Sequence, residues 1–91
     1  MAVTIIIPTA LRQYAGGSSE VEVEAKTTGE ALERLTSTHA ELRKHLYNDQ
    51  NRLRNFVNIY LNDEDIRYLG QLETPLKEGD SISILPALAG G

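Results

Sequence analysis

The residues best suited to chemistry stand at the end of the sequence, which finishes Leu85-Pro86-Ala87-Leu88-Ala89-Gly90-Gly91. Four of the five residues after Pro86 are alanine or glycine, so this segment is narrow and builds no core of its own. Fully extended, it reaches at most about 17 Å beyond the strand that precedes it. The terminal glycines place no Cβ beside the carboxylate. Such a tail can thread a tunnel and deliver its carboxylate to another protein's active site. Because chain ends are often small and frayed, an incidental Gly-Gly remains the alternative.

Two other groups of side chains have the right types for metal binding but the wrong spacing. His39 and His45 are six residues apart, so on one helix they point to nearly opposite sides and share no metal. We expect both to be surface or half-buried histidines. The run Asp63-Glu64-Asp65 can hold a hard cation through its carboxylates. It lacks the spacing and the glycine of a calcium loop, so a solvated turn is favoured.

Basic residues gather in the middle of the sequence, at Arg43, Lys44, Arg52 and Arg54. They can form a positive patch for a partner or a phosphate, although a mixed solvated face is the favoured interpretation. Gly16-Gly17 is not followed by the Gly-Lys-Ser/Thr of a phosphate-binding loop, and no local signature of a Ser-His-Asp triad occurs. The interior of the sequence therefore predicts no active site of its own.

Length and composition exclude several further classes of function. The chain has 91 residues, 41% of them apolar, which suits one small soluble domain. It has no cysteine, so it forms no disulfide, no thiolate metal cage and no cysteine nucleophile. The net charge of −4 argues against nucleic acid and predicts partner grooves that are neutral or basic. No targeting signal is evident and no segment approaches the roughly 20 apolar residues of a membrane span, so we expect a cytoplasmic protein.

The first half of the chain alternates in a way that predicts a β-hairpin followed by a helix. Ala2–Pro8 places Val3, Ile5 and Ile7 on one face and Ile6 on the other, as in a central strand. Residues 19–25 alternate valine and alanine with glutamate, which is typical of a half-buried antiparallel strand. Thr27 and Glu30 have the spacing of a capping box, in which each side chain bonds the other residue's N–H. The helix is expected to weaken at 36–38, a second short helix to cover 40–47, and a loop to follow at 48–55.

The second half of the chain predicts three strands. Phe56–Asn62 is the strongest, a polar turn leads into a short strand at Ile66–Tyr68, and Ser81–Leu85 is the last, ended by Pro86 because proline donates no hydrogen bond. The resulting order β-β-α-β-β-β predicts an α+β fold. We assign residues 1–86 to a β-grasp (ubiquitin-like) roll, a mixed sheet with one main helix across one face, and 87–91 to an extended, flexible C-terminal tail.

Several blocks of sequence carry a resemblance to a known family. They are Val3-Thr4, Ile7-Pro8-Thr9 and Leu11-Arg12 at the start, Phe56-Val57-Asn58-Ile59-Tyr60 with Asn62-Asp63-Glu64-Asp65 in the middle, and Glu78-Gly79-Asp80 with Ile84-Leu85-Pro86-Ala87 through Gly90-Gly91 at the end. With these blocks the chain resembles the MoaD/ThiS family of ubiquitin-like sulfur carriers. The nearest likeness is to the branch that supplies sulfur to a cysteine synthase.

The resemblance implies a function in which the chain is a co-substrate rather than an enzyme. An E1-like adenylyltransferase/sulfurtransferase would use ATP to adenylate Gly91, next to Gly90, and sulfur would then replace AMP to give a thiocarboxylate. The client is expected to be a cysteine synthase, with molybdopterin synthase or thiazole synthase as alternatives. No cofactor is bound by the carrier itself. A ubiquitin-like modifier joined to lysine through Gly91, and an interaction module with an incidental Gly-Gly, remain competing interpretations.

Partner binding is expected to use an apolar patch beside the tail. The candidates are Phe56, Leu85, Pro86, Ala87, Leu88 and Ala89. Packing in the core is an equal alternative for Phe56, whereas Leu88 follows the last strand and has no evident core to join.

Overall fold

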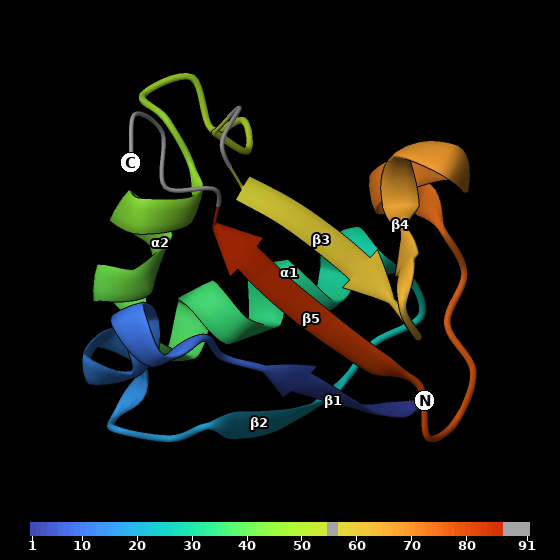
Figure 1. The fold of residues 1–91 in the computed structure, drawn as a ribbon, viewed down its shortest axis with the longest axis horizontal. Coiled ribbons are helices and arrows are strands. Elements are labelled where there is room, and N and C mark those ends of the chain that lie inside the picture. Colours follow the sequence, from blue (N-terminus) through green and yellow to red (C-terminus); the bar gives the residue numbers. More distant parts are fainter. Residues whose placement is uncertain (55–56, 87–91) are drawn as a thin grey trace.

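The computed structural model describes residues 1–54 and 57–86, which form a mixed sheet with helices on one face (Figure 1). The elements are β1 (Ala2–Ile6), η1 (Thr9–Ala15), β2 (Glu20–Glu24), α1 (Thr28–Thr38), α2 (Ala40–Leu46), β3 (Val57–Leu61), β4 (Glu64–Asp65), η2 (Ile66–Tyr68), η3 (Gln71–Glu73) and β5 (Ser81–Pro86), where η marks a 3-10 helix. The strand order in the sheet is β2-β1-β5-β3-β4. The predicted β-grasp fold, with one main helix across a mixed sheet, is confirmed. The predicted tail at 87–91 lies outside the described residues.

The N-terminal hairpin follows the predicted alternation. β1 and β2 pair antiparallel, with Val3 opposite Val23 and Ile5 opposite Val21. Val3 and Ile5 are buried in the core, and the two valines of β2 are half-buried against it. The glutamates of β2 are exposed, as expected. The connection between the strands contains η1, a 3-10 helix that the sequence pattern did not predict.

Helix α1 begins at a cap that is only partly the predicted capping box. The Thr27 hydroxyl accepts a hydrogen bond from the Glu30 N–H at 3.2 Å, as expected. The Glu30 carboxylate, however, accepts from the N–H of Lys26 at 2.8 Å, so the reciprocal bond predicted to the Thr27 N–H is wrong. Thr27 is extended (φ −132°, ψ 162°), which turns the preceding N–H toward the first helical turn.

Residues 36–38, where the helix was expected to weaken, form the last turn of α1, which ends at Thr38. The Thr36 hydroxyl donates to the carbonyl of Leu32 at 2.9 Å, and the Thr38 hydroxyl donates to that of Arg34 at 3.2 Å. Both bonds run to the carbonyl four residues back, a pattern that slightly destabilises a helix, and α1 ends at Thr38. α2 then forms as expected and packs beside α1.

The segment after β3 differs from the prediction. Asn62 (φ 49°) and Asp63 (φ 73°) form a tight two-residue turn, so the short strand β4 begins at once and ends at Asp65. The Asp65 carboxylate then accepts the N–H of Arg67 at 2.9 Å and caps η2. Because this bond starts a helical turn, residues 66–68 form a 3-10 helix and not the predicted strand.

Strand β5 lies at the centre of the sheet. It runs parallel to β1, with Ile82 beside Ile5, and antiparallel to β3, with Ile84 opposite Ile59. These four isoleucines are at most 2% exposed, and the apolar face of α1 covers them. The order of the strands therefore places β5, which ends at Pro86, between β1 and β3 (Figure 1).

Candidate functional site

The predicted partner-binding residues of the described chain lie at the end of β5. Leu85 is 47% exposed although it is a large apolar side chain in a central strand. Pro86, the last strand residue, is half-buried and pairs with Val57 of β3. The other predicted site residues lie outside the described residues: Phe56, Ala87, Leu88, Ala89, Gly90 and Gly91.

Pro86 occupies a position in the sheet where a proline removes no hydrogen bond. The Asn62 N–H donates to the Ser81 carbonyl at 2.8 Å, which marks a hydrogen-bonded pair at the start of the β3–β5 ladder. Because such pairs alternate, the Val57–Pro86 pair is one that exchanges no hydrogen bonds. On the other side β1 has already ended, since its last residue, Ile6, lies beside Ser83. The strand can therefore end in proline without an orphaned ladder partner.

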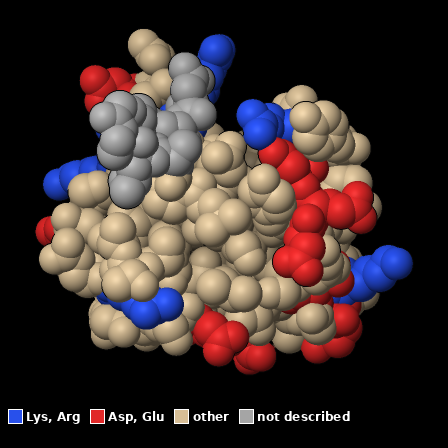
Figure 2. All heavy atoms as spheres, in the orientation of Figure 1, with Lys and Arg blue, Asp and Glu red and all other residues tan. Residues whose placement is uncertain are grey.

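An uncharged band lies on the sheet face opposite the helices and leads to Leu85. Strand alternation turns alternate residues of the three central strands to this face, and we call them the open-face band: Thr4, Ile6, Asn58, Tyr60, Ser83 and Leu85. Ile6 is 37% exposed here. Figure 2 shows an uncharged surface across the middle of this face, with acidic side chains gathered on one side of it. Sequence reasoning missed the band, although the alternation that set Ile6 apart from Val3 and Ile5 was its signal.

The two histidines lie in different surroundings. His39 caps the start of α2, whereas the ring of His45 stacks on Tyr14, with centroids 3.9 Å apart. No group of three or more His, Asp or Glu side chains that could hold a metal is found within residues 1–54 and 57–86. Both histidines are half-buried, as predicted.

The acidic run 63–65 serves the turn and the following helix. Asp65 is 9% exposed and pairs with the Arg67 guanidinium at 2.6 Å. The hydrogen bonds from the Arg67 side chain and N–H lower the pKa of Asp65. Asp63 lies in the left-handed turn. The run therefore forms a turn, as favoured from the sequence, in which the Asp65 carboxylate is paired with Arg67.

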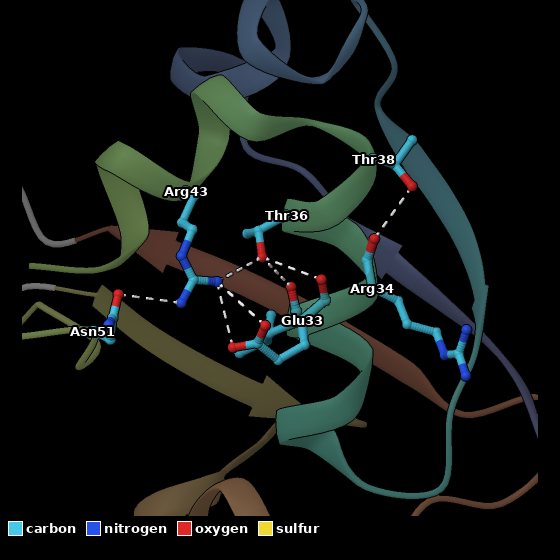
Figure 3. A network of polar contacts seen from close by, with 7 residues as sticks. Glu33, Arg34, Thr36, Thr38, Arg43 and Asn51 are labelled. Atoms are coloured by element: carbon cyan, nitrogen blue, oxygen red, sulfur yellow. Dashed lines mark hydrogen bonds and ion pairs between the residues drawn. The ribbon is translucent and has the colours of Figure 1, made fainter.

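Arg43 joins the two helices and the loop that follows them (Figure 3). One of its guanidinium nitrogens lies 3.3 Å from both carboxylate oxygens of Glu33 and 3.2 Å from the Thr36 hydroxyl. The other donates to the Asn51 side chain at 3.4 Å. The guanidinium also lies over the Tyr47 ring, 4.4 Å from its centroid. This network fixes the 48–54 loop, which leads into β3.

The fold and the family match together define the class of protein. In the part of the chain that the structure describes, no helix is long and apolar enough to cross a bilayer. The mixed five-stranded sheet, with its main helix on one face and an uncharged opposite face, is the architecture of a ubiquitin-like β-grasp protein. The ThiS family model matches residues 5–91, and the chain belongs to the ThiS family.

Known relatives agree with this assignment along the whole chain. The chain is 42% identical to the sulfur carrier protein CysO of Mycobacterium tuberculosis over 93 residues, which covers 100% of both proteins. It is similar to a chain of the BexX/CysO complex of Amycolatopsis orientalis, with 44% identity and a TM-score of 0.87 over 98% of this chain and 99% of that one. The small archaeal modifier protein 1 of Methanosarcina acetivorans matches with 30% identity and a TM-score of 0.90, over 99% and 96% of the two chains.

Proposed function

We propose that this protein is a CysO-like sulfur carrier whose C-terminal Gly91 bears the sulfur as a thiocarboxylate. The observation that carries the proposal is the 42% identity to CysO over the full length of both chains. The Gly90-Gly91 end, five residues beyond the end of β5, supplies a narrow segment for another protein's active site.

The proposed activation needs an enzyme because a carboxylate is a poor electrophile. A carboxylate oxygen of Gly91 attacks the α-phosphorus of ATP, pyrophosphate leaves, and an acyl-adenylate forms on an E1-like partner. Hydrosulfide then attacks the carbonyl carbon, and AMP leaves. If a persulfide is the donor, a thiol must afterwards cleave the acyl disulfide to release the thiocarboxylate. ATP belongs to the partner, and we propose that the carrier binds no cofactor and works in the cytoplasm.

The thiocarboxylate would act as a nucleophile on a client enzyme. Its sulfur is anionic at neutral pH and soft, so it suits an electrophile such as an aminoacrylate formed from an activated serine. We favour a cysteine synthase as client because the relatives at 42% identity are CysO proteins. A molybdopterin synthase large subunit or a thiazole synthase would use the same group on a different electrophile. In each case the carrier is consumed and regenerated as a co-substrate and performs no catalysis itself.

The client enzyme and the activating enzyme would both bind the surface around the tail. The open-face band offers an uncharged surface with two exposed apolar side chains, Ile6 and Leu85, and Pro86 follows Leu85 at the end of β5. We propose that Phe56, Ala87, Leu88 and Ala89 extend this contact.

The direct test is the intact mass of the protein after incubation with its adenylating partner, ATP and sulfide. We expect a species in which one oxygen is replaced by sulfur, and its loss on deletion of Gly91. A chain whose mass stays unchanged while a known ThiS-family carrier is converted by its own partner under the same conditions would overturn the proposal.

A second candidate function is a ubiquitin-like modifier joined through Gly91 to lysine amines. The likeness to small archaeal modifier protein 1 favours it, and both functions begin with the same adenylation. Conjugates to other proteins that survive thiol reagents and disappear without Gly91 would support this role.

A further inference from the structure

Several basic residues lie near the C-terminal end of β5. The guanidinium of Arg54 donates to the carbonyl of Lys44 at 3.1 and 3.2 Å. The Val57 N–H donates to the Arg54 carbonyl at 3.0 Å, and Val57 pairs with Pro86. Arg52 precedes Arg54 in the same loop, with its carbonyl bonded to the N–H of Asn48. We call Lys44, Arg52 and Arg54 the tail-root cluster.

The stability of the fold explains only part of this cluster. Arg43 beside it is balanced by Glu33, and Arg54 caps the carboxyl end of α2, where positive charge is favourable. Lys44 and Arg52 are exposed, and their side chains make no hydrogen bond or ion pair with the residues the structure describes. Asp49 lines the same surface hollow as Lys44 and offsets one charge. The cluster as a whole remains positive.

The opposite end of β5 is acidic. The Asn62 side chain donates to Asp80 at 2.9 Å, which joins the 62–63 turn to the turn before β5, and the Glu78 carboxylate accepts from the Ala2 N–H. Exposed Asp63 and Glu64 belong to the same end. Acidic side chains gather at this side of the molecule in Figure 2. β5 advances about 3.3 Å per residue, so its two ends lie roughly 17 Å apart. That exceeds the Debye length of about 8 Å at physiological salt, so a partner at one end hardly senses the other.

We propose that the tail-root cluster docks on an acidic surface at the entrance of the adenylating partner's tail channel. The proposal rests on the proposed function and names the chemistry of that partner's surface. The tail can enter a channel only if the end of β5 approaches it, so the charges around Pro86 meet the partner first. A basic rim would repel Lys44 and Arg52 there, whereas an acidic rim attracts them and speeds encounter. The net charge of −4 predicted a neutral or basic partner surface. At this end of β5 we instead expect the partner surface to be acidic.

Two double variants with equal net charge distinguish the effect of where the charges lie from the effect of the total charge. Lys44→Glu/Arg52→Glu reverses the cluster, and Arg34→Glu/Lys77→Glu reverses two exposed basic residues elsewhere. The assay is carrier-dependent ATP–pyrophosphate exchange by the purified adenylating enzyme, with kcat/KM measured at low salt and at about 0.5 M. At low salt we expect the cluster variant to lose roughly tenfold in kcat/KM, through KM. The control variant should stay within about twofold, and high salt should bring all three proteins together because it screens exposed charges.

Folding and function are checked separately. Circular dichroism melts show whether each variant keeps the fold, and Lys44→Gln/Arg52→Gln, which removes the charges without reversing them, should show a smaller loss in the same direction. Equal kcat/KM for the cluster and control variants, or a gain for the cluster variant, would overturn the acidic surface while leaving the proposed function intact. Absence of exchange with the unchanged protein would instead remove the proposed function, and with it the partner named here.

Discussion

Replacing Arg43 by alanine should destabilise the domain by about 2 kcal/mol, because one side chain links α1, α2 and the 48–54 loop. The ion pair with Glu33 is partly exposed and uses a single nitrogen, so it contributes roughly 0.2–1 kcal/mol. The stack on buried Tyr47 adds about 0.5–1 kcal/mol. The bonds to Thr36 and Asn51 are long, 3.2 and 3.4 Å, and should add about 0.5 kcal/mol each.

The assay is urea unfolding followed by circular dichroism, with two companion variants. Arg43→Lys keeps a positive charge near Glu33 but loses the planar stack, so it should cost about half as much as alanine. Glu33→Gln removes only the ion pair and should cost at most about 1 kcal/mol, less at high salt. Thr36 still donates to Leu32 in every variant, so no buried hydroxyl is orphaned.

The reasoning fails if the alanine variant loses less than about 0.5 kcal/mol, which would mean that the network is not populated in solution. It also fails if lysine and alanine are equally destabilising while Glu33→Gln is neutral at every salt concentration. In that case neither the ion pair nor the positive charge would contribute. Because lysine keeps the aliphatic stem, the whole loss would come from the planar guanidinium and its contacts with Tyr47, Thr36 and Asn51.

Two further predictions concern close packing and acid stability. Gly29→Ala in α1 should destabilise the domain by about 1 kcal/mol in thermal melts, instead of giving the usual helical gain. The reason is that a Cβ at this position would lie 3.0 Å from the Leu72 carbonyl oxygen. The control, Ser37→Ala at an exposed position of the same helix, should be neutral or slightly stabilising. The Arg67 hydrogen bonds hold the pKa of Asp65 below its unfolded value of about 3.9, so the stability they add is full above pH 4 and is lost as the pH falls through the lowered pKa. Asp65→Asn should therefore differ from the unchanged protein at pH 6 and approach it as the pH is lowered in urea unfolding, and parallel curves would contradict this assignment.

Much of the fold could be predicted because strands and helix ends have local signals. Period-two alternation identified β1 and β2 and placed Val3 and Ile5 in the core, and the Thr27 hydroxyl marked the start of α1. Glu30 bonded the N–H one residue before the predicted one, since that choice depends on the backbone angles at Thr27 and not on residue type.

The errors share a physical cause, which is a side chain that bonds to nearby backbone. Glu30 bonds to the Lys26 N–H in place of the Thr27 N–H, and Asp65 bonds to the Arg67 N–H and converts an expected strand into a 3-10 helix. A propensity or an alternating pattern counts each residue by itself and does not include such bonds.

The local charge around the tail could not be predicted from the sequence, for a different reason. A net charge of −4 is an average over the chain, and it predicts neutral or basic partners only if charge is spread evenly. In the fold, Asp80 lies just before β5 and the tail-root cluster lies beside its far end, so a single central strand separates acid from base. Exposed charges act over about one Debye length, which is shorter than this strand. What a partner at the tail meets is therefore decided by which end of β5 each charge adjoins, and only the topology of the sheet fixes that.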